Sequence, residues 1–280
     1  MPSRIILNAV SDTLPIYRVT AKNTSTGENK IHDDATARRY GFPGALVPGV
    51  TVYAYMTQPL AAAFGAAWLT RGTATVRFVK PVLEGEEVTV AGDITARDGR
   101  GVTATVTAGT PSTPVCATLT ATIPAGHPIP VNVATYGEAP LPDPRPEATR
   151  EHWASVATLG TPRVHYDDAA AEAYVAKVGE ALALYRGPGG WVHPGFLLEQ
   201  GNRALDRNVK MGPWIHVGST VRHLGGARVG DGLATRGKVR SLFEKKGREF
   251  VEVDVVIVAG ERARPVAHLL HTAIYRLPPP

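Results

Sequence analysis

The sequence contains an internal repeat, which constrains the fold more than any other feature. Residues 72–78 (GTATVRF) correspond to residues 217–223 (VGSTVRH), which lie 145 positions further along. A second pair of passages, NKIHDD at 29–34 and RVHYDD at 163–168, lies near the start of each half. Self-similarity of this kind outranks predictions from single segments. The duplication predicts two similar units with a cleft between them.

Each half shows the same order of expected elements. A loop with the histidine passage precedes a short helix, a Pro/Gly turn, a longer helix and Val/Thr/Ile-rich runs typical of strands. The expected helices are 35–40, 50–67, 169–185 and 196–208, and the expected strands are 73–78, 87–96, 102–108, 114–123, 215–224, 233–243, 249–258 and 267–276. This pattern predicts an α+β fold in which two antiparallel sheets each wrap a long helix and join edge to edge.

A proline-rich stretch at 126–150 separates the two halves. It lacks a periodic apolar pattern and is typical of an extended linker. We therefore expect an amino-terminal repeat at 1–125 and a carboxy-terminal repeat at 151–280.

Composition excludes several classes of function. The net charge of +5 suits an anionic partner such as a phosphate-bearing carrier, although genome composition and solubility explain it equally well. No basic run is interleaved with aromatic residues, so we expect no nucleic-acid partner. The histidines lack ligand spacing and no Gly-rich strand-to-helix motif is present, so we predict neither a metal nor a nucleotide cofactor.

The sequence also predicts a cytoplasmic protein. Residues 1–13 lack the pattern of a signal peptide, and the longest apolar stretch, 60–69, is too short to span a bilayer, so we expect no membrane partner. Cys116 is the sole cysteine, which rules out an intrachain disulfide.

The first half carries a motif spread over four places. GENKIH at 27–32 is followed by Ala37, Gly-Phe at 41–42 and LVPG at 46–49. This order resembles the MaoC-like (R)-specific enoyl-thioester hydratases, whose pattern is roughly Gly-Asp-x-Asn-Pro-Ile-His, Ala, Gly-Phe and Pro-Ile-x-His-Gly. The resemblance implies the double hotdog fold and a lyase that adds water to an acyl thioester or removes it.

The motif departs from the family at three positions. Gly27 stands where the family has its aspartate, and Glu28 replaces that aspartate only if the loop is one residue shorter. Lys30 stands at the family's proline, and Pro48 at the histidine before the helix.

The second half resembles a different branch, the acyl-carrier-protein dehydratases. Their helix begins Pro-Gly-Val-Leu-x-x-Glu, and its glutamate works with a histidine of the other subunit. PGFLLEQ at 194–200 is similar to that helix start, with its acidic residue, Glu199, one place before the family's glutamate, and the first half has Tyr53 at the place of Glu199. If the halves pack as hotdog dimers do, His32 and Glu199 share one cleft.

The resemblance and the chemistry together assign the catalytic roles. His32 suits the base, because its unperturbed pKa lies near neutrality. Glu28 or Glu199 suits the acid if its surroundings raise its pKa. Each has a plainer interpretation: His32 as a loop hydrogen bond, Glu199 as a helix-surface pair with Arg203, and Glu28 as a solvated carboxylate.

The other candidates are substrate-binding residues. Asn29 suits orientation of His32 or of the thioester carbonyl. The amide of Gly49 begins a helix and suits an oxyanion, because helix N-termini offer unpaired donors. Tyr53 and His193 are candidates for the pocket wall, and packing explains both equally well.

Three other functions remain open beside hydration of a thioester carried by coenzyme A or an acyl carrier protein. Loss of the family aspartate is compatible with a repurposed pocket that cyclises or rearranges a polyketide-like or fatty-acyl substrate. Glu199 is compatible with a thioesterase, and a non-catalytic acyl-binding module is the fourth. Hotdog proteins often associate in pairs, which leaves a homodimer open.

Overall fold

The computed structural model describes residues 12–278, whose strands form one ten-stranded antiparallel sheet. The strand order is β1-β3-β4-β5-β2-β7-β10-β9-β8-β6, so each half contributes five strands in the same internal order. The strands are β1 (Tyr17–Thr20), β2 (Thr73–Phe78), β3 (Glu87–Asp98), β4 (Gly101–Gly109), β5 (Ala117–Pro124), β6 (Arg163–His165), β7 (Ile215–His223), β8 (Gly232–Lys245), β9 (Arg248–Ala259) and β10 (Arg264–Arg276). The expected α+β class and the expected repeat are confirmed.

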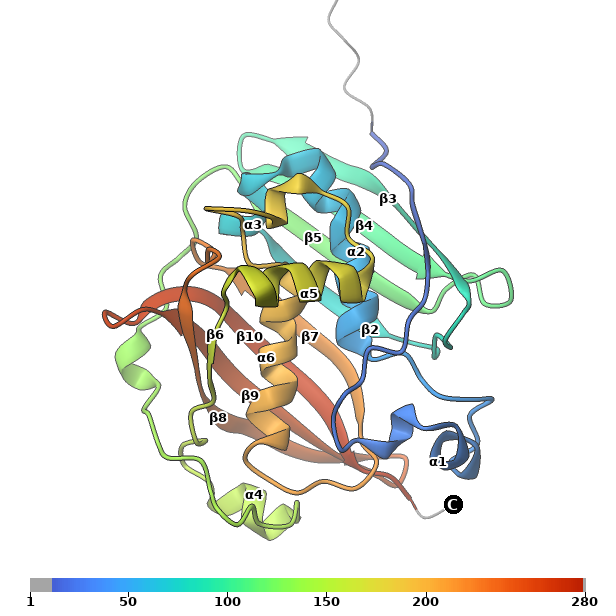
Figure 1. Cartoon of the computed structure of the whole chain (residues 1–280), viewed down its shortest axis with the longest axis vertical. Coiled ribbons are helices and arrows are strands. Elements are labelled where there is room, and N and C mark those ends of the chain that lie inside the picture. Colours follow the sequence, from blue (N-terminus) through green and yellow to red (C-terminus); the bar gives the residue numbers. More distant parts are fainter. Residues whose placement is uncertain (1–11, 279–280) are drawn as a thin grey trace, which may run out of the picture.

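The helices gather on one face of this sheet (Figure 1). They are α1 (Asp34–Arg39), α2 (Gly49–Phe64), α3 (Ala66–Arg71), α4 (Arg150–Ser155), α5 (Asp168–Val178) and α6 (Pro194–Asp206), with 3₁₀ turns at Lys30–His32, Val133–Thr135 and Ala183–Tyr185. The long helix α2 packs on strands of the first half, and α6 packs on β8, β9 and β10 of the second. Each half is therefore a helix wrapped by its own part of the sheet.

The two halves join where β2 pairs with β7. The pairing is antiparallel, and Thr75 lies opposite Thr220, the residue that occupies the same place in the repeat. Their hydroxyl oxygens are 3.4 Å apart. Val76 and Val221 are buried, whereas Thr75 and Arg77 are exposed, as the period-two pattern of a half-buried strand predicts. One apolar core runs continuously beneath both halves.

Glycines end two helices earlier than the sequence pattern predicted. Gly65 has φ +51° and separates α2 from α3, so the helix expected at 50–67 is broken there. Gly179 adopts the left-handed conformation and ends α5 at Val178, so the expected extension to 185 was wrong. The short elements β1, β6 and α4 were not predicted, because three to six residues give too little pattern.

Two expectations concerned membrane-spanning segments and a signal peptide. No helix among residues 12–278 is long and apolar enough to cross a membrane. The predicted lack of a signal peptide concerns residues 1–13, of which 1–11 lie outside the described part.

The contact between α2 and α6 depends on Gly195. A Cβ atom at this position would lie 2.6 Å from the Ala54 Cβ and 2.5 Å from the Tyr174 hydroxyl oxygen. Overpacking of this kind costs about 1–3 kcal/mol. We therefore expect Gly195→Ala to lower the free energy of unfolding by that amount in urea denaturation. Gly212→Ala is the control, because its Cβ would meet no atom within 4 Å. Equal stability of the two variants would contradict this packing.

Candidate functional site

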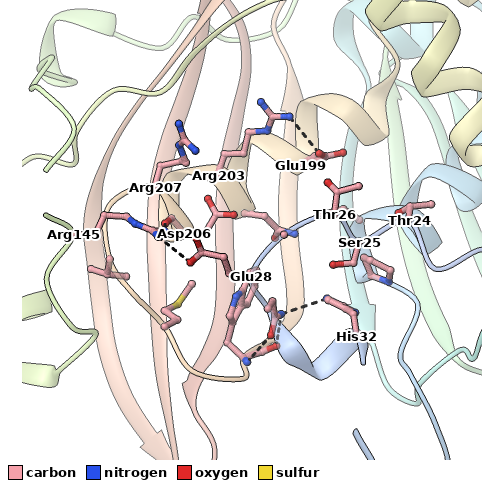
Figure 2. Close-up of a pocket in the computed structure, with 18 of the residues that line it drawn as sticks. Thr24, Ser25, Thr26, Glu28, His32, Arg145, Glu199, Arg203, Asp206 and Arg207 are labelled. Atoms are coloured by element: carbon pink, nitrogen blue, oxygen red, sulfur yellow. Dashed lines mark hydrogen bonds and ion pairs between the residues drawn. The ribbon is translucent and has the colours of Figure 1, made fainter. Parts of the chain in front are cut away.

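A polar cavity of about 320 Å³ lies between a loop of the first half and helix α6 of the second. His32 and Glu28 reach it from the loop, and Glu199 and Asp206 reach it from α6 (Figure 2). The structure thus brings His32, Glu28 and Glu199 into one cavity, together with Asn29. It is formed by both halves of the chain.

The His32 ring is held in one orientation by its local fold. Asn29 caps the 3₁₀ turn Lys30–His32 by accepting from the Ile31 amide, and Asp33 caps α1 by accepting from the Thr36 amide. The Nδ1 atom of His32 is 2.7 Å from the Leu46 carbonyl oxygen. A carbonyl only accepts, so Nδ1 carries the hydrogen and donates it, which leaves a lone pair on Nε2 of the neutral ring.

The Asn29 side-chain amide keeps that Nε2 atom unprotonated, as a hydrogen-bond acceptor. Its Nδ2 donates to the Trp214 carbonyl at 2.9 Å, and its Oδ1 accepts from the Trp214 amide at 3.1 Å. These two bonds set which end of the amide is nitrogen. The same Nδ2 lies 3.3 Å from His32 Nε2 and donates to it. Burial lowers the pKa of His32, although the Leu46 carbonyl opposes the shift. His32 is therefore held as a neutral base.

A second, apolar cavity of about 210 Å³ adjoins the first at His32. Five residues line both cavities: Asn29, His32, Pro48, Asn202 and Trp214. The Asn202 side chain forms no hydrogen bond with any residue of the described chain, and its Oδ1 is buried. His32 and Asn202 thus stand where the two cavities meet.

The start of α2 faces the same place. The backbone N–H groups of Gly49 and Val50 have no hydrogen-bond partner among residues 12–278, because the first helical bonds are made by Thr51 and Val52 to Pro48. Gly49 lines the apolar cavity and Val50 lines the polar one. A Cβ at Gly49 would lie 3.0 Å from the Phe78 ring and 3.1 Å from His216 Nδ1, so the site favours glycine. Two free donors and the positive end of a helix suit an oxyanion.

The two predicted carboxylates are both engaged by cations. Glu28 accepts from the Arg145 guanidinium at 2.8 and 3.0 Å and is largely exposed. Glu199 lies 3.2 Å from Lys177 Nζ and 3.6 Å from the Arg203 guanidinium. Gly27, at the position of the family aspartate, lies in open space, because a Cβ added there would meet no atom within 4 Å.

Sequence reasoning missed Asp206, which lines the polar cavity from the last turn of α6. Burial raises its pKa to about 6, against the nearby guanidinium groups of Arg203, Arg207 and Arg145. Its Oδ1 is buried without a hydrogen-bond partner in the described chain. The available signal was its spacing: Asp206 follows Glu199 by seven residues, which places both on one face of a helix.

Two predicted pocket residues lie elsewhere. Tyr53 is fully buried in the core and lines neither cavity. His193 is also fully buried: its Nδ1 accepts from the Gly195 amide at 3.0 Å and caps α6, and its ring lies 4.4 Å from that of Tyr185. Packing and capping account for both residues, which is the alternative that the sequence left open for them.

The described residues include no group of three or more His, Cys, Asp or Glu side chains arranged to hold a metal ion. His216 and His271, which lie close together, are buried and share a hydrogen-bond partner. Ser219 Oγ lies 2.9 Å from both His216 Nε2 and His271 Nδ1, and the two rings stack at 4.1 Å.

Comparison with known proteins gives structural but not sequence relatives. No protein-family profile and no curated protein matches the sequence. A Chloroflexus aurantiacus protein described as a MaoC domain dehydratase is similar in structure, with a TM-score of 0.63, 11% identity and 96% of each chain covered. A Mycobacterium tuberculosis protein described as a double hotdog has a TM-score of 0.62, with 14% identity over 93% of this chain and 96% of that one.

A third structural relative carries a different description. It is a Novosphingobium aromaticivorans protein described as a thioesterase, with a TM-score of 0.54, 13% identity and 96% of this chain and 100% of that one covered. At these identities the likeness concerns the fold alone. Two five-stranded halves, each wrapped around a long helix and joined through β2 and β7, together with these relatives, show that the protein has the double hotdog fold.

Proposed function

We propose that the protein is a hydratase or dehydratase that acts on an α,β-unsaturated or 3-hydroxyacyl thioester. The observation that carries the proposal is the neutral His32 ring, whose Nε2 is an acceptor held by Asn29, in a site whose lining also includes Gly49 and Val50 with their unpaired amides. Addition of water to a double bond conjugated with a thioester needs a base for water and donors for the enolate oxygen. Both are found within one site.

The thioester carbonyl accepts from the two amides at the start of α2. Water takes the place of the Asn29 Nδ2 donor at His32 Nε2 and gives its proton to that atom, and the oxygen of that water bonds to the β-carbon. The electron pair of the double bond moves toward the carbonyl, and the resulting enolate oxygen is stabilised by the amides. Protonation of the α-carbon completes the addition, and dehydration follows the same steps in reverse.

Asp206 is our candidate for the acid. A carboxyl group with a pKa of about 6 is partly protonated just below neutral pH and can give its proton to the α-carbon. Glu28 and Glu199 are each engaged in ion pairs with cations, whereas Asp206 forms none in the described chain. Asn202, at the junction of the cavities, is free to hydrogen-bond the 3-hydroxyl group.

The structural relatives support a thioester substrate without separating lyase from hydrolase, because they are described as dehydratases and as a thioesterase. The carrier would be coenzyme A or an acyl carrier protein. A thioesterase would direct the same activated water to the thioester carbon. Release of free thiol from saturated acyl thioesters would identify that activity.

The first test uses oxygen-18 water with a panel of enoyl-thioesters and mass spectrometry. We expect the label in the 3-hydroxy product, and we expect His32→Ala to lower the rate at least about 100-fold, the usual contribution of a general base. His165→Ala is the matched control: His165 occupies the corresponding passage of the second half and is exposed on β6.

Circular dichroism establishes that each variant folds, and His32→Gln serves if the alanine variant does not. Full activity in folded His32 variants would overturn the assignment of the base. Absence of label with every thioester would overturn hydration itself and favour the repurposed pocket.

The pH dependence tests Asp206. His32 must be neutral, which holds above its lowered pKa, and Asp206 must be protonated, which holds below about 6. We therefore expect the rate to fall as the pH rises through about 6. Asp206→Asn should be slower and should lose this alkaline fall, because an amide does not titrate. An unchanged alkaline fall in the variant would assign it to another group.

The raised pKa of Asp206 also predicts how the stability of the protein depends on pH, which can be measured without turnover. Its folded pKa of about 6 exceeds the unfolded value of about 3.9, so the folded state binds the proton more tightly and the carboxyl destabilises the fold once ionised. Between pH 5 and 7.5 we expect the wild type to lose about 1 kcal/mol more stability than Asp206→Asn, allowing for solvent screening. Asp93→Asn, an exposed change on β3, is the control in urea denaturation.

A further inference from the structure

We propose that the acyl group of the substrate is short and ends in a carboxylate. This inference rests on the proposed function and specifies its substrate class. It follows from two observations. One of the cavities that meet at His32 is apolar and the other is polar, and a basic groove adjoins the apolar one.

The apolar cavity leads toward a basic groove on the outer face of the sheet. The cavity and the groove share Phe78, Val79, Val217, Arg248 and Ile274. Lys80 lines the cavity, Arg77, Lys245, Lys246 and Arg248 line the groove, and Glu252 is the one acidic residue of the groove lining. A phosphopantetheine arm is a thin chain with a phosphate at its far end, which matches an apolar passage that ends among cations.

This placement leaves the polar cavity for the acyl group. The thioester carbonyl would lie at the amides of Gly49, which lines the apolar cavity, and Val50, which lines the polar one, so the acyl chain extends from His32 toward α6. The walls there include the Ser25 and Thr26 hydroxyls, which have no hydrogen-bond partner in the described chain, and the guanidinium groups of Arg203 and Arg207. A plain alkyl chain in this space would remove these groups from water without replacing their hydrogen bonds, which is unfavourable.

The charges of the polar cavity favour an anion. Four cations and three carboxylates line it, and Glu28 and Glu199 together engage Arg145, Lys177 and Arg203. Arg207 forms no ion pair with any residue of the described chain and is exposed. The remaining carboxyl group, Asp206, loses its charge near pH 6. Figure 2 shows Arg207, the residue that follows α6, near Arg203, whose guanidinium is turned to Glu199, so Arg207 is the cation that can bind a carboxylate at the end of a short acyl chain.

The experiment compares two enoyl-thioesters of equal carbon number, glutaconyl-coenzyme A and pent-2-enoyl-coenzyme A. We expect kcat/KM to be at least about 10-fold higher for glutaconyl-coenzyme A, the effect of one charge-assisted contact. Arg207→Gln should reduce this ratio about 10-fold. Arg100→Gln is the control, because Arg100 is 93% exposed at the β3–β4 turn and pairs with Asp98.

Calorimetric titration with the saturated thioesters separates this inference from the proposed function. Glutaryl-coenzyme A should bind more tightly than pentanoyl-coenzyme A, and Arg207→Gln should abolish the difference. Turnover of both enoyl-thioesters with no preference, or a preference for pent-2-enoyl, overturns the carboxylate assignment and keeps the hydratase. Tighter binding of glutaryl-coenzyme A without turnover of any enoyl-thioester supports the carboxylate site and overturns the hydratase.

Discussion

The site depends on the pairing of β2 with β7. This single antiparallel contact makes the sheet continuous and brings α2 and α6 together, close enough that Gly195 packs on Ala54. The loop before α1 belongs to the first half and the polar face of α6 to the second. The loop and the helix line one cavity because the halves join through these two strands. Separated halves would each present an incomplete site.

The two copies have diverged in complementary ways. Almost the whole first part of α2, from Val50 to Thr57, is buried, so this helix serves the core and contributes backbone amides at its start. In contrast, α6 keeps a polar stripe with Glu199, Asn202 and Asp206 facing the cavity. The histidine passage shows the opposite division, because His32 lies in the cavity and His165 lies exposed on the edge strand β6. Each half supplies what the other has lost.

The fold could be predicted from the sequence almost entirely, because it is specified by local periodicity and by the repeat. The expected strand at 73–78 agrees with β2 at both ends, and the other long strands agree to within a few residues. The placement of His32, Asn29 and Glu199 in one cavity also followed, since each sits in a spaced motif. Asp206 did not, because its pKa is raised by burial, which only the tertiary fold provides and which outweighs the opposing effect of the nearby arginines. Tyr53 and His193 could not be assigned to the core or to the pocket wall, because a helix pattern does not reveal which buried face meets a cavity.

The side-chain nitrogen of Asn29 decides whether His32 can act as a base. Its Nδ2 donates both to the Trp214 carbonyl and toward His32 Nε2, so replacing that nitrogen by oxygen would turn an acceptor toward each of them. Deamidation of Asn29 to aspartate makes this replacement with almost no change in the shape of the side chain. The new carboxylate would repel the Trp214 carbonyl and attract a proton to the imidazole, which becomes a cation without a lone pair. Chemical ageing at this one position would therefore silence the base while the double sheet around it stays folded.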